Sequence, residues 1–270
     1  MDTKKLKVCI FVHYSVSETL PYNVNIYINE LSLYFDKVNV LTNNSKITRE
    51  NSSVNSNVKF EYFENKGYDF GMIYRFLSKQ NLDKFEEIAF VNDSNILLNK
   101  LDKVIQTGRK SISDFWGIID SNEKPWFSTH ADNYHIQSHF LVVNKKAINR
   151  LPSFFNQLNV TDIMEETDPK QLRRKVIDQW EIGLTQYFLS QKLTPFSVID
   201  SEQLKLKFKT RKHNLLFSHY FELVTEGYPF VKRKVIQKTR KKHLFKKYIP
   251  IEKQLSEFVY SEWDIHQLFA

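Results

Sequence analysis

The sequence is poor in cysteine, glycine and proline. Its single cysteine, Cys9, cannot form an internal disulfide, which suits a buried thiol in a reducing compartment. Six glycines and seven prolines in 270 residues are few for a turn-rich β-sandwich, so helices and longer strands are expected. No apolar run approaches the roughly 18 residues of a membrane span, and no signal-peptide core precedes Val8. We therefore expect a cytoplasmic protein built around one α/β domain.

Acidic residues are absent from one segment near the C-terminus. Lys232–Lys247 contains nine Lys/Arg and no Asp or Glu, and without it the chain has 30 basic against 31 acidic residues. The net charge of +8 therefore belongs to this segment. It could be a solvated helix face, a nucleic-acid patch or an attachment to the anionic inner face of the plasma membrane. We favour the membrane, because Val235, Ile236, Leu244 and Phe245 lie among the charges.

Apolar segments alternate with helical and turn-forming segments along the chain. Strands are predicted at Lys5–Val12, Val38–Leu41, Val58–Phe63, Ile88–Val91, Asp114–Ile119, Tyr134–Val143 and Pro195–Ile199. Helices are expected between most of them and again within Pro250–Ala270, whereas Thr161–Asp178 is predicted to be a polar loop running into a helix. This order predicts an α/β fold with a mainly parallel, doubly wound sheet.

The segment Ile88–Asn95 is the centre of this prediction. Four apolar residues, typical of a strand buried on both faces, are followed by Asn92, Asp93, Ser94 and Asn95. Open α/β sheets bind ligands at such strand ends. Asp93-Ser94-Asn95 is close to the Asp-x-Asp signature by which many glycosyltransferases hold a divalent cation. From its spacing alone, an ordinary Asx turn is the simpler interpretation.

Two further segments carry candidate site residues. Gly67 and Gly71, four residues apart before a helix, permit a sharp turn and close approach by a ligand, although Asp69 could simply cap the helix. In the predicted strand Tyr134–Val143, residues His135, Gln137 and His139 alternate with Ile136, Ser138 and Phe140 and share one face. Without a cysteine or a firm third ligand beside them, hydrogen bonding is favoured over zinc binding.

Five short motifs in a fixed order resemble the rhamnan synthesis protein F family. They are Asn65-x-Gly67-x-Asp69-Phe70-Gly71, Asn92-Asp93-Ser94, His135-x-Gln137-Ser138-x-Phe140, Trp180-Glu181-x-Gly183-Leu184-Thr185 and Gly227-x-Pro229-Phe230-x-Lys232. The resemblance covers roughly Lys5–Ile236. It implies a GT-A-type, Rossmann-like, mainly parallel sheet with flanking helices over residues 1–227. No family motif is found from Gln237 onward, and composition alone predicts that residues 228–270 form a basic, amphipathic, helical C-terminal extension.

The resemblance also implies an activity. Members are bacterial glycosyltransferases that move a sugar from a nucleoside diphosphate donor, here a UDP- or dTDP-sugar, to a growing surface polysaccharide or lipopolysaccharide. The acceptor glycan would be carried on a lipid at the membrane. Two alternatives remain open: a nucleic-acid-binding α/β protein, which no recognised nucleic-acid motif supports, and a catalytically idle glycan-binding member of the family.

Roles for individual residues follow from the resemblance. Glu181 would be the catalytic base of an inverting transfer, although a helix N-terminus also favours a glutamate. Asp93 and Asn95 would hold Mg²⁺ or Mn²⁺, with metal dependence in doubt because Asn95 is neutral. The donor would contact His13, Tyr14, Asn65, Gly67, Asp69, Asn92 and Asp93. His135, Gln137 and His139 would bind acceptor hydroxyls or the leaving diphosphate, with a protonated imidazole offsetting developing charge.

Overall fold

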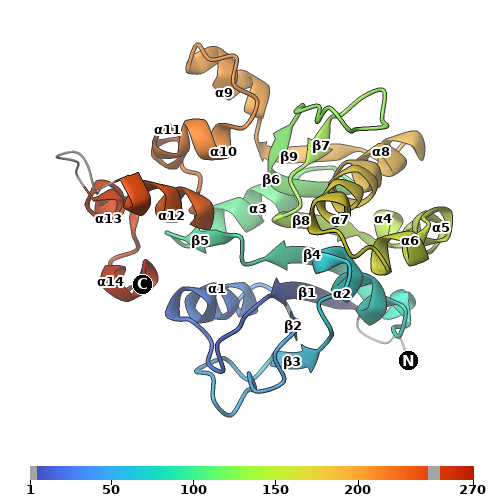
Figure 1. The fold of residues 1–270 in the computed structure, drawn as a ribbon, viewed down its shortest axis with the longest axis horizontal. Coiled ribbons are helices and arrows are strands. Elements are labelled where there is room, and N and C mark those ends of the chain that lie inside the picture. The colour runs from blue at the N-terminus through green and yellow to red at the C-terminus, as the bar shows by residue number, and fades with distance from the viewer. Residues whose placement is uncertain (1–4, 243–249) are drawn as a thin grey trace.

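The structure is a computed structural model that describes residues 5–242 and 250–270. Figure 1 shows a central sheet that runs from β3 to β9, with helices on both sides. Leu244 and Phe245, which the sequence analysis placed among the membrane-facing residues, lie outside the described residues.

The strands form a mixed sheet. They are β1 (Leu6–His13), β2 (Lys37–Thr42), β3 (Val58–Tyr62), β4 (Phe85–Asn92), β5 (Asn95–Leu97), β6 (Phe115–Ser121), β7 (His135–Ile136), β8 (Phe140–Asn144), β9 (Pro195–Ile199) and β10 (Phe230–Lys232). The order of the main sheet is β3-β2-β1-β4-β8-β6-β7, with β9 paired to β6. β1 pairs in parallel with β2 and with β4, β2 pairs in parallel with β3, and β6 pairs in parallel with β9. β8 is antiparallel to both β4 and β6. The predicted α/β class, with a mainly parallel sheet and flanking helices, is confirmed.

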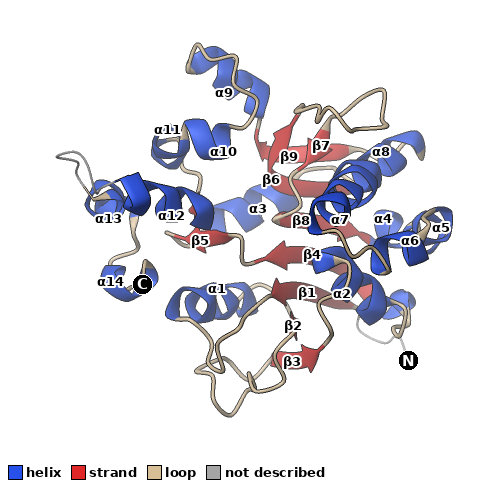
Figure 2. Cartoon of the chain, in the orientation of Figure 1, coloured by secondary structure: helices blue, strands red, loops and turns tan. Residues whose placement is uncertain are grey.

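The two layers of helices cover opposite faces of the sheet (Figure 2). The helices are α1 (Tyr22–Ser32), α2 (Tyr68–Leu77), α3 (Asp102–Lys110), α4 (Lys145–Ile148), α5 (Leu151–Gln157), α6 (Val160–Met164), α7 (Pro169–Lys175), α8 (Gly183–Ser190), α9 (Ser201–Lys207), α10 (Leu215–Ser218), α11 (Tyr220–Thr225), α12 (Arg233–Lys242), α13 (Ile251–Leu255) and α14 (Ile265–Leu268). A π-helix, η2 (Val176–Ile182), joins α7 to α8, and short 3₁₀ turns lie at η1 (Leu82–Lys84) and η3 (Ser256–Phe258).

Burial on both faces explains the apolar runs of the central strands. In β1, Val8 and Ile10 join the core beneath α2, η2 and α8, whereas Cys9 and Phe11 join the core beneath α1 and α3. Each of these residues is at most 1% exposed. Alternate side chains of a strand point to opposite faces, so a strand covered on both sides requires apolar residues at consecutive positions.

The predicted single strand Tyr134–Val143 is wrong at its centre. Asp120 pairs with Ile136 and Gly117 pairs with Leu141, so three steps along β6 correspond to five steps along the partner. The two extra residues form a bulge between β7 and β8, around Gln137. Bulges often redirect side chains next to active sites. This bulge arises from the pairing of β7 and β8 with β6, which is distant in the sequence.

The polar segment 161–178 is more helical than its composition suggested. Asp168 caps α7 by accepting hydrogen bonds from the backbone nitrogens of Lys170 at 2.7 Å and Gln171 at 2.9 Å. Pro169 occupies the first turn, where a missing N–H costs nothing. From α7 the chain continues through η2 into α8.

The described part of residues 228–270, the expected C-terminal extension, packs against the rest of the chain. β10 pairs with β5 in a second, two-stranded sheet. A third apolar cluster joins Ile96 of β5 to Val231, Ile251 and Leu268. In Figure 1, α13 and α14 accordingly lie beside β5 and α1. The described C-terminal residues are therefore part of the same globular body.

Candidate functional site

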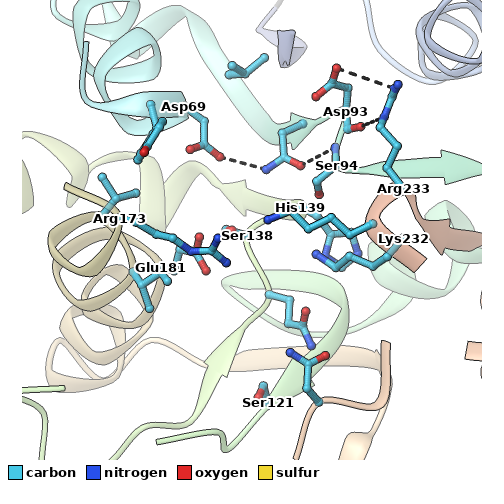
Figure 3. Close-up of a pocket in the computed structure, with 18 of the residues that line it drawn as sticks. Asp69, Asp93, Ser94, Ser121, Ser138, His139, Arg173, Glu181, Lys232 and Arg233 are labelled. Atoms are coloured by element: carbon cyan, nitrogen blue, oxygen red, sulfur yellow. Dashed lines mark hydrogen bonds and ion pairs between the residues drawn. The ribbon is translucent and has the colours of Figure 1, made fainter. Parts of the chain in front are cut away.

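A cavity of about 890 Å³ lies at the carboxyl ends of β1 and β4. Its walls come from segments far apart in the sequence: the ends of these two strands, α2, the bulge between β7 and β8, η2 and the start of α12. Figure 3 shows Glu181 and Arg173 on one side of this cavity, Lys232 and Arg233 on the other, and Asp69 and Asp93 between them. The position agrees with the edge at which open α/β sheets bind ligands.

Asp93 is held by two basic side chains. Its Oδ2 lies 2.6 Å from Nδ1 of the buried His13. Nη2 of Arg233 lies 3.8 Å from the same oxygen, and Nε of Arg233 donates to the backbone oxygen of Asp93 at 2.9 Å. The Asp93 carboxylate is thereby fixed in position, and Arg233 is oriented at the cavity wall.

A second carboxylate comes from α2. Asp69 Oδ2 accepts a hydrogen bond from Nδ2 of Asn92 at 3.0 Å, which links the helix start to the end of β4. Burial raises the pKa of Asp69, and the nearby charge of Asp93 raises it further, while the hydrogen bond from Asn92 opposes the change. Asp69 therefore holds a proton more readily than an exposed aspartate does.

Glu181 projects into the cavity from the π-helix η2. Its neighbour Trp180 is buried and packs against Phe70 and Phe90, with ring centroids 5.4 and 5.7 Å apart. This packing fixes the turn that carries Glu181. Burial raises the pKa of Glu181 to about 7, and the charge of Asp69 contributes to the rise. Single π-turns occur often at functional sites.

Lysine and arginine side chains also line the cavity, and no site role was predicted for any of them from the sequence. Lys232, the last residue of β10, and Arg233, the first of α12, line it together with Lys234 and with Arg173 of α7. Burial lowers the pKa of Lys232, while the nearby carboxylate of Glu181 opposes the change. The one sequence signal for this arrangement was Lys232 at the end of the motif that starts at Gly227.

His135, Gln137 and His139 all line the cavity, although the strand that was expected to present them is interrupted. Nε2 of His139 lies 2.9 Å from the hydroxyl oxygen of Tyr228. Burial lowers the pKa of both His135 and His139, in the case of His139 well below its ordinary value. The protonated imidazole that was expected to offset developing charge is therefore disfavoured, and the positive charge of the cavity comes from lysine and arginine.

Other predicted donor residues divide into two groups. Tyr14, Asn65, Asp69, Asn92 and Asp93 line the cavity, whereas His13 and Gly67 are not among its lining residues.

Gly67 at the N-cap of α2 and Gly71 in its first turns are both required by the backbone of the chain. Gly67 adopts a φ of 73°, which favours glycine, and a Cβ on Gly71 would lie 1.8 Å from the carbonyl oxygen of Lys66.

The residues present do not fit the expected metal site. Asn95 is 2% exposed, and both polar atoms of its side chain are buried without a hydrogen-bond partner, away from the cavity. The Asp93 carboxylate is already engaged by His13 and Arg233. Within residues 5–242 and 250–270, no group of three or more His, Cys, Asp or Glu side chains is arranged to hold a metal ion. Asp93 and Asn95 therefore do not form a chelating pair in this structure.

The rim of the cavity carries an exposed aromatic residue. Pro125 lines the cavity, and the adjacent Trp126 is 80% exposed. The guanidinium carbon of Arg174 lies 4.6 Å from the centroid of the Trp126 ring, so a cation covers one side of the indole. None of the sequence motifs includes Trp126.

The fold and the cavity define an α/β protein whose ligand site combines carboxylates with basic side chains suited to phosphate groups. A family model described as rhamnan synthesis protein F matches residues 39–259. The chain belongs to the rhamnan synthesis protein F family, as its motifs predicted. Family membership supports a transferase role in glycan synthesis.

Comparison with curated proteins gave no match. Among solved structures, a putative glucose-1-phosphate thymidylyltransferase from Bacillus anthracis is similar with 8% identity and a TM-score of 0.44, over 72% of this chain and 86% of that chain. A 4-diphosphocytidyl-2C-methyl-D-erythritol synthase from Anaerococcus prevotii is similar with 12% identity and a TM-score of 0.39, over 73% and 89% of the two chains. In the part of the chain that the structure describes, no helix is both long and apolar enough to cross a bilayer.

Proposed function

We propose that this protein is an inverting glycosyltransferase with Glu181 as its catalytic base. It would transfer a hexose from a nucleoside diphosphate sugar, a UDP- or dTDP-sugar, to a hydroxyl of a surface polysaccharide or lipopolysaccharide glycan. In the reaction the acceptor oxygen attacks the anomeric carbon and its proton passes to Glu181. The bond from that carbon to the phosphate oxygen breaks, and the nucleoside diphosphate leaves with the electron pair.

The observation that carries this proposal is the environment of Glu181. A carboxylate whose pKa is raised to about 7 is matched to proton transfer near neutral pH, because it is partly ionised there and still basic enough to accept a proton. It shares one cavity with Asp69, Asp93, Lys232 and Arg233. An ordinary helix-terminal glutamate would face solvent and need no such surroundings.

The donor side of the cavity is formed by the ends of β1 and β4. Tyr14 follows β1, Asn65 precedes α2, and Asp93 follows β4, so three separate segments could contact the nucleotide. Asp69 and Asn92 join these segments through their hydrogen bond. We assign this side to the nucleoside diphosphate because strand ends and a helix start together suit a phosphorylated ligand.

The acceptor would enter on the side of the bulge and the rim. His135, Gln137 and His139 offer neutral hydrogen-bonding groups for sugar hydroxyls. Trp126, exposed beside Pro125, offers an apolar surface on which a sugar ring could rest. A mostly neutral acceptor side opposite a charged donor side fits a glycan substrate.

The acceptor would be carried by a lipid at the inner face of the plasma membrane, which Lys232–Lys247 could approach. Within this segment Lys234 and Lys238 are exposed, whereas Val235 and Ile236 are buried in the third apolar cluster and cannot enter a bilayer. Attachment would therefore be electrostatic, at about 1 kcal/mol per basic residue near anionic lipid. Lys238→Glu should weaken binding to phosphatidylserine-containing vesicles. Lys110→Glu, at an exposed position of α3, is the control. Equal binding of the two variants would contradict this part of the proposal.

The test begins with thermal stabilisation by a panel of UDP-, dTDP- and GDP-sugars, because a ligand that binds the folded state raises its apparent stability. The donor that stabilises is then used in a transfer assay with parent protein and Glu181→Gln. We expect the variant to keep donor binding and to lose transfer by roughly 10²- to 10⁴-fold. Glu165→Gln, which changes an exposed carboxylate outside the cavity, is the matched control.

Two results would contradict the proposal. Full transfer by Glu181→Gln would remove Glu181 as the base. Donor binding without any transfer in the parent protein would instead identify a catalytically idle, glycan-binding member of the family.

A further inference from the structure

Lys232 and Arg233 occupy one wall of the cavity with their orientation set by β10 and the start of α12. β10 is held by antiparallel pairing in which Lys232 lies opposite Asn95, two residues after Asp93. The guanidinium of Arg233 is anchored to the Asp93 backbone at 2.9 Å and lies 3.5 Å from Oδ1 of Asn23. These cations are thus preorganised beside the strand end where the donor is expected.

The charge around Lys232 favours an incoming anion. Its side chain is largely enclosed, and the acidic groups close to it are Glu181 and, more weakly, Asp69, while Lys234 and Arg173 add positive charge. Neither carboxylate is a strong partner, because burial raises the pKa of both and favours their protonated forms. An enclosed ammonium with weak partners gains most from a multiply charged ligand.

The two residues expected to bind a metal ion, Asp93 and Asn95, do not form a metal site at the end of β4. Asn95 is buried and is not among the residues that line the cavity, and Asp93 is already paired with His13 and Arg233. A metal ion at Asp93 would lie beside the guanidinium of Arg233, which is 3.8 Å from Oδ2 of Asp93, and the two positive charges would repel each other. Positive charge at this strand end is supplied by the chain itself.

We propose that Lys232 and Arg233, assisted by Arg173 from the opposite wall, bind the diphosphate of the donor in place of a divalent cation. This inference rests on the proposed function and specifies how its donor is recognised. The guanidinium offers paired N–H donors that match phosphate oxygens, and the ammonium acts as a point charge. As the bond to the anomeric carbon breaks, the negative charge that develops on the leaving diphosphate is stabilised by these two cations.

The test is calorimetric titration of the full protein with UDP and with dTDP, in EDTA and again in Mg²⁺ or Mn²⁺. We expect the nucleotide that binds to do so in EDTA with a Kd within about threefold of its value with metal. Lys232→Met should weaken binding in EDTA at least about tenfold, since a charge-assisted contact contributes roughly 1.5–3 kcal/mol. Lys103→Met, an exposed lysine of α3 outside the cavity, should bind as the parent does.

A second variant separates loss of charge from loss of folding. Lys232→Arg keeps the positive charge and should retain metal-free binding within about fivefold of the parent, with thermal melting of each variant measured alongside. If Lys232→Met does not fold, the comparison of Lys232→Arg with the parent at low and high salt takes its place, and in both the affinity should fall steeply as salt is added.

The possible outcomes are distinct. Binding that requires Mg²⁺ or Mn²⁺ would overturn the inference and leave the proposed function standing. Binding in EDTA that is unchanged in Lys232→Met, or insensitive to salt, would also overturn it. If no nucleoside diphosphate or its sugar binds under any condition, the proposed function itself fails. Metal-free binding that depends on Lys232 supports both.

Discussion

Asp178 accepts two hydrogen bonds from Thr129, one from its backbone nitrogen at 2.9 Å and one from its hydroxyl at 2.7 Å. A ring nitrogen of His130 lies 3.0 Å from the Asp178 backbone oxygen. Asp178 is three residues before Glu181 on η2. The rim segment that carries Trp126 is thereby attached to the turn that carries the proposed base.

Thr129→Val should loosen this attachment. The substitution removes the hydroxyl bond to a buried carboxylate and leaves the backbone bond, so we expect a loss of about 1–3 kcal/mol in the free energy of unfolding. The KM for the acceptor should rise more than that for the donor. Urea unfolding and steady-state kinetics measure the two effects, with Thr225→Val on the exposed surface of α11 as control. Equal changes in both KM values would argue against a role of this bond at the acceptor rim.

The rate of transfer should depend on the ionisation of Glu181. Its pKa of about 7 means that the basic form is lost as the pH falls below neutrality. We expect kcat/KM to fall about tenfold per pH unit below this value and to level off above it. Initial rates between pH 5.5 and 8.5, with melting curves to confirm folding at each pH, provide the measurement. A flat profile over this range would be inconsistent with Glu181 as the base.

Stability should change with pH in a direction fixed by the same group. The folded-state pKa of Glu181 lies above its ordinary value of 4.5, so the protonated form is the one the fold favours. That stabilisation is present below about pH 4.5 and is lost as the pH rises through about 7.

Glu181→Gln removes this dependence because the amide does not ionise. The free energy of unfolding of the variant should match that of the parent near pH 4 and exceed it by up to about 3 kcal/mol at pH 8. Urea titrations at both pH values test this. A variant that is less stable than the parent at pH 8 would show that the ionised side chain is well accommodated.

Trp126→Ala should act on the acceptor alone. The indole is exposed, and its ring contacts in the described structure are with Arg174 and the adjacent Phe127, so its removal costs little stability. We expect the acceptor KM to rise several-fold, with nucleotide affinity unchanged. Trp126→Phe retains an aromatic surface and should recover part of the affinity. Identical kinetics for the parent and Trp126→Ala would place the acceptor elsewhere.

Ile251→Ala tests whether the C-terminal helices belong to the main body. Ile251 is fully buried in the third apolar cluster, so truncation should cost about 2–5 kcal/mol. The protein should still unfold in a single transition that is shifted as a whole. Leu206→Ala, at a site 80% exposed, should have almost no effect. Two separate transitions in the parent protein would restore the boundary after residue 227.

What the sequence could predict depended on local information. Consecutive apolar residues predicted β1 and β4. Short motifs singled out Asp93 and Glu181, and both residues line the cavity. The bulge at Gln137 could not be foreseen, because it arises from the register of β7 and β8 against a distant strand.

The basic segment shows the same limit. A run of lysine and arginine has the composition of a solvated or membrane-facing surface, and nothing within it distinguishes Lys232 and Arg233 from their neighbours. The distinction comes from pairing of β10 with β5, which directs these two toward the cavity and buries Val235. Asn95 failed as a ligand for a related reason, since β5 carries its side chain into the interior.

The short ribbon formed by β5 and β10 has a consequence for how such a site could diverge. Because neighbouring strand residues face opposite ways, one residue inserted at the Gly227 turn would slip the register and exchange Lys232 for an apolar neighbour. The large sheet would be untouched. Insertion of a single codon here could thus remove a positive charge from the cavity without changing the main sheet.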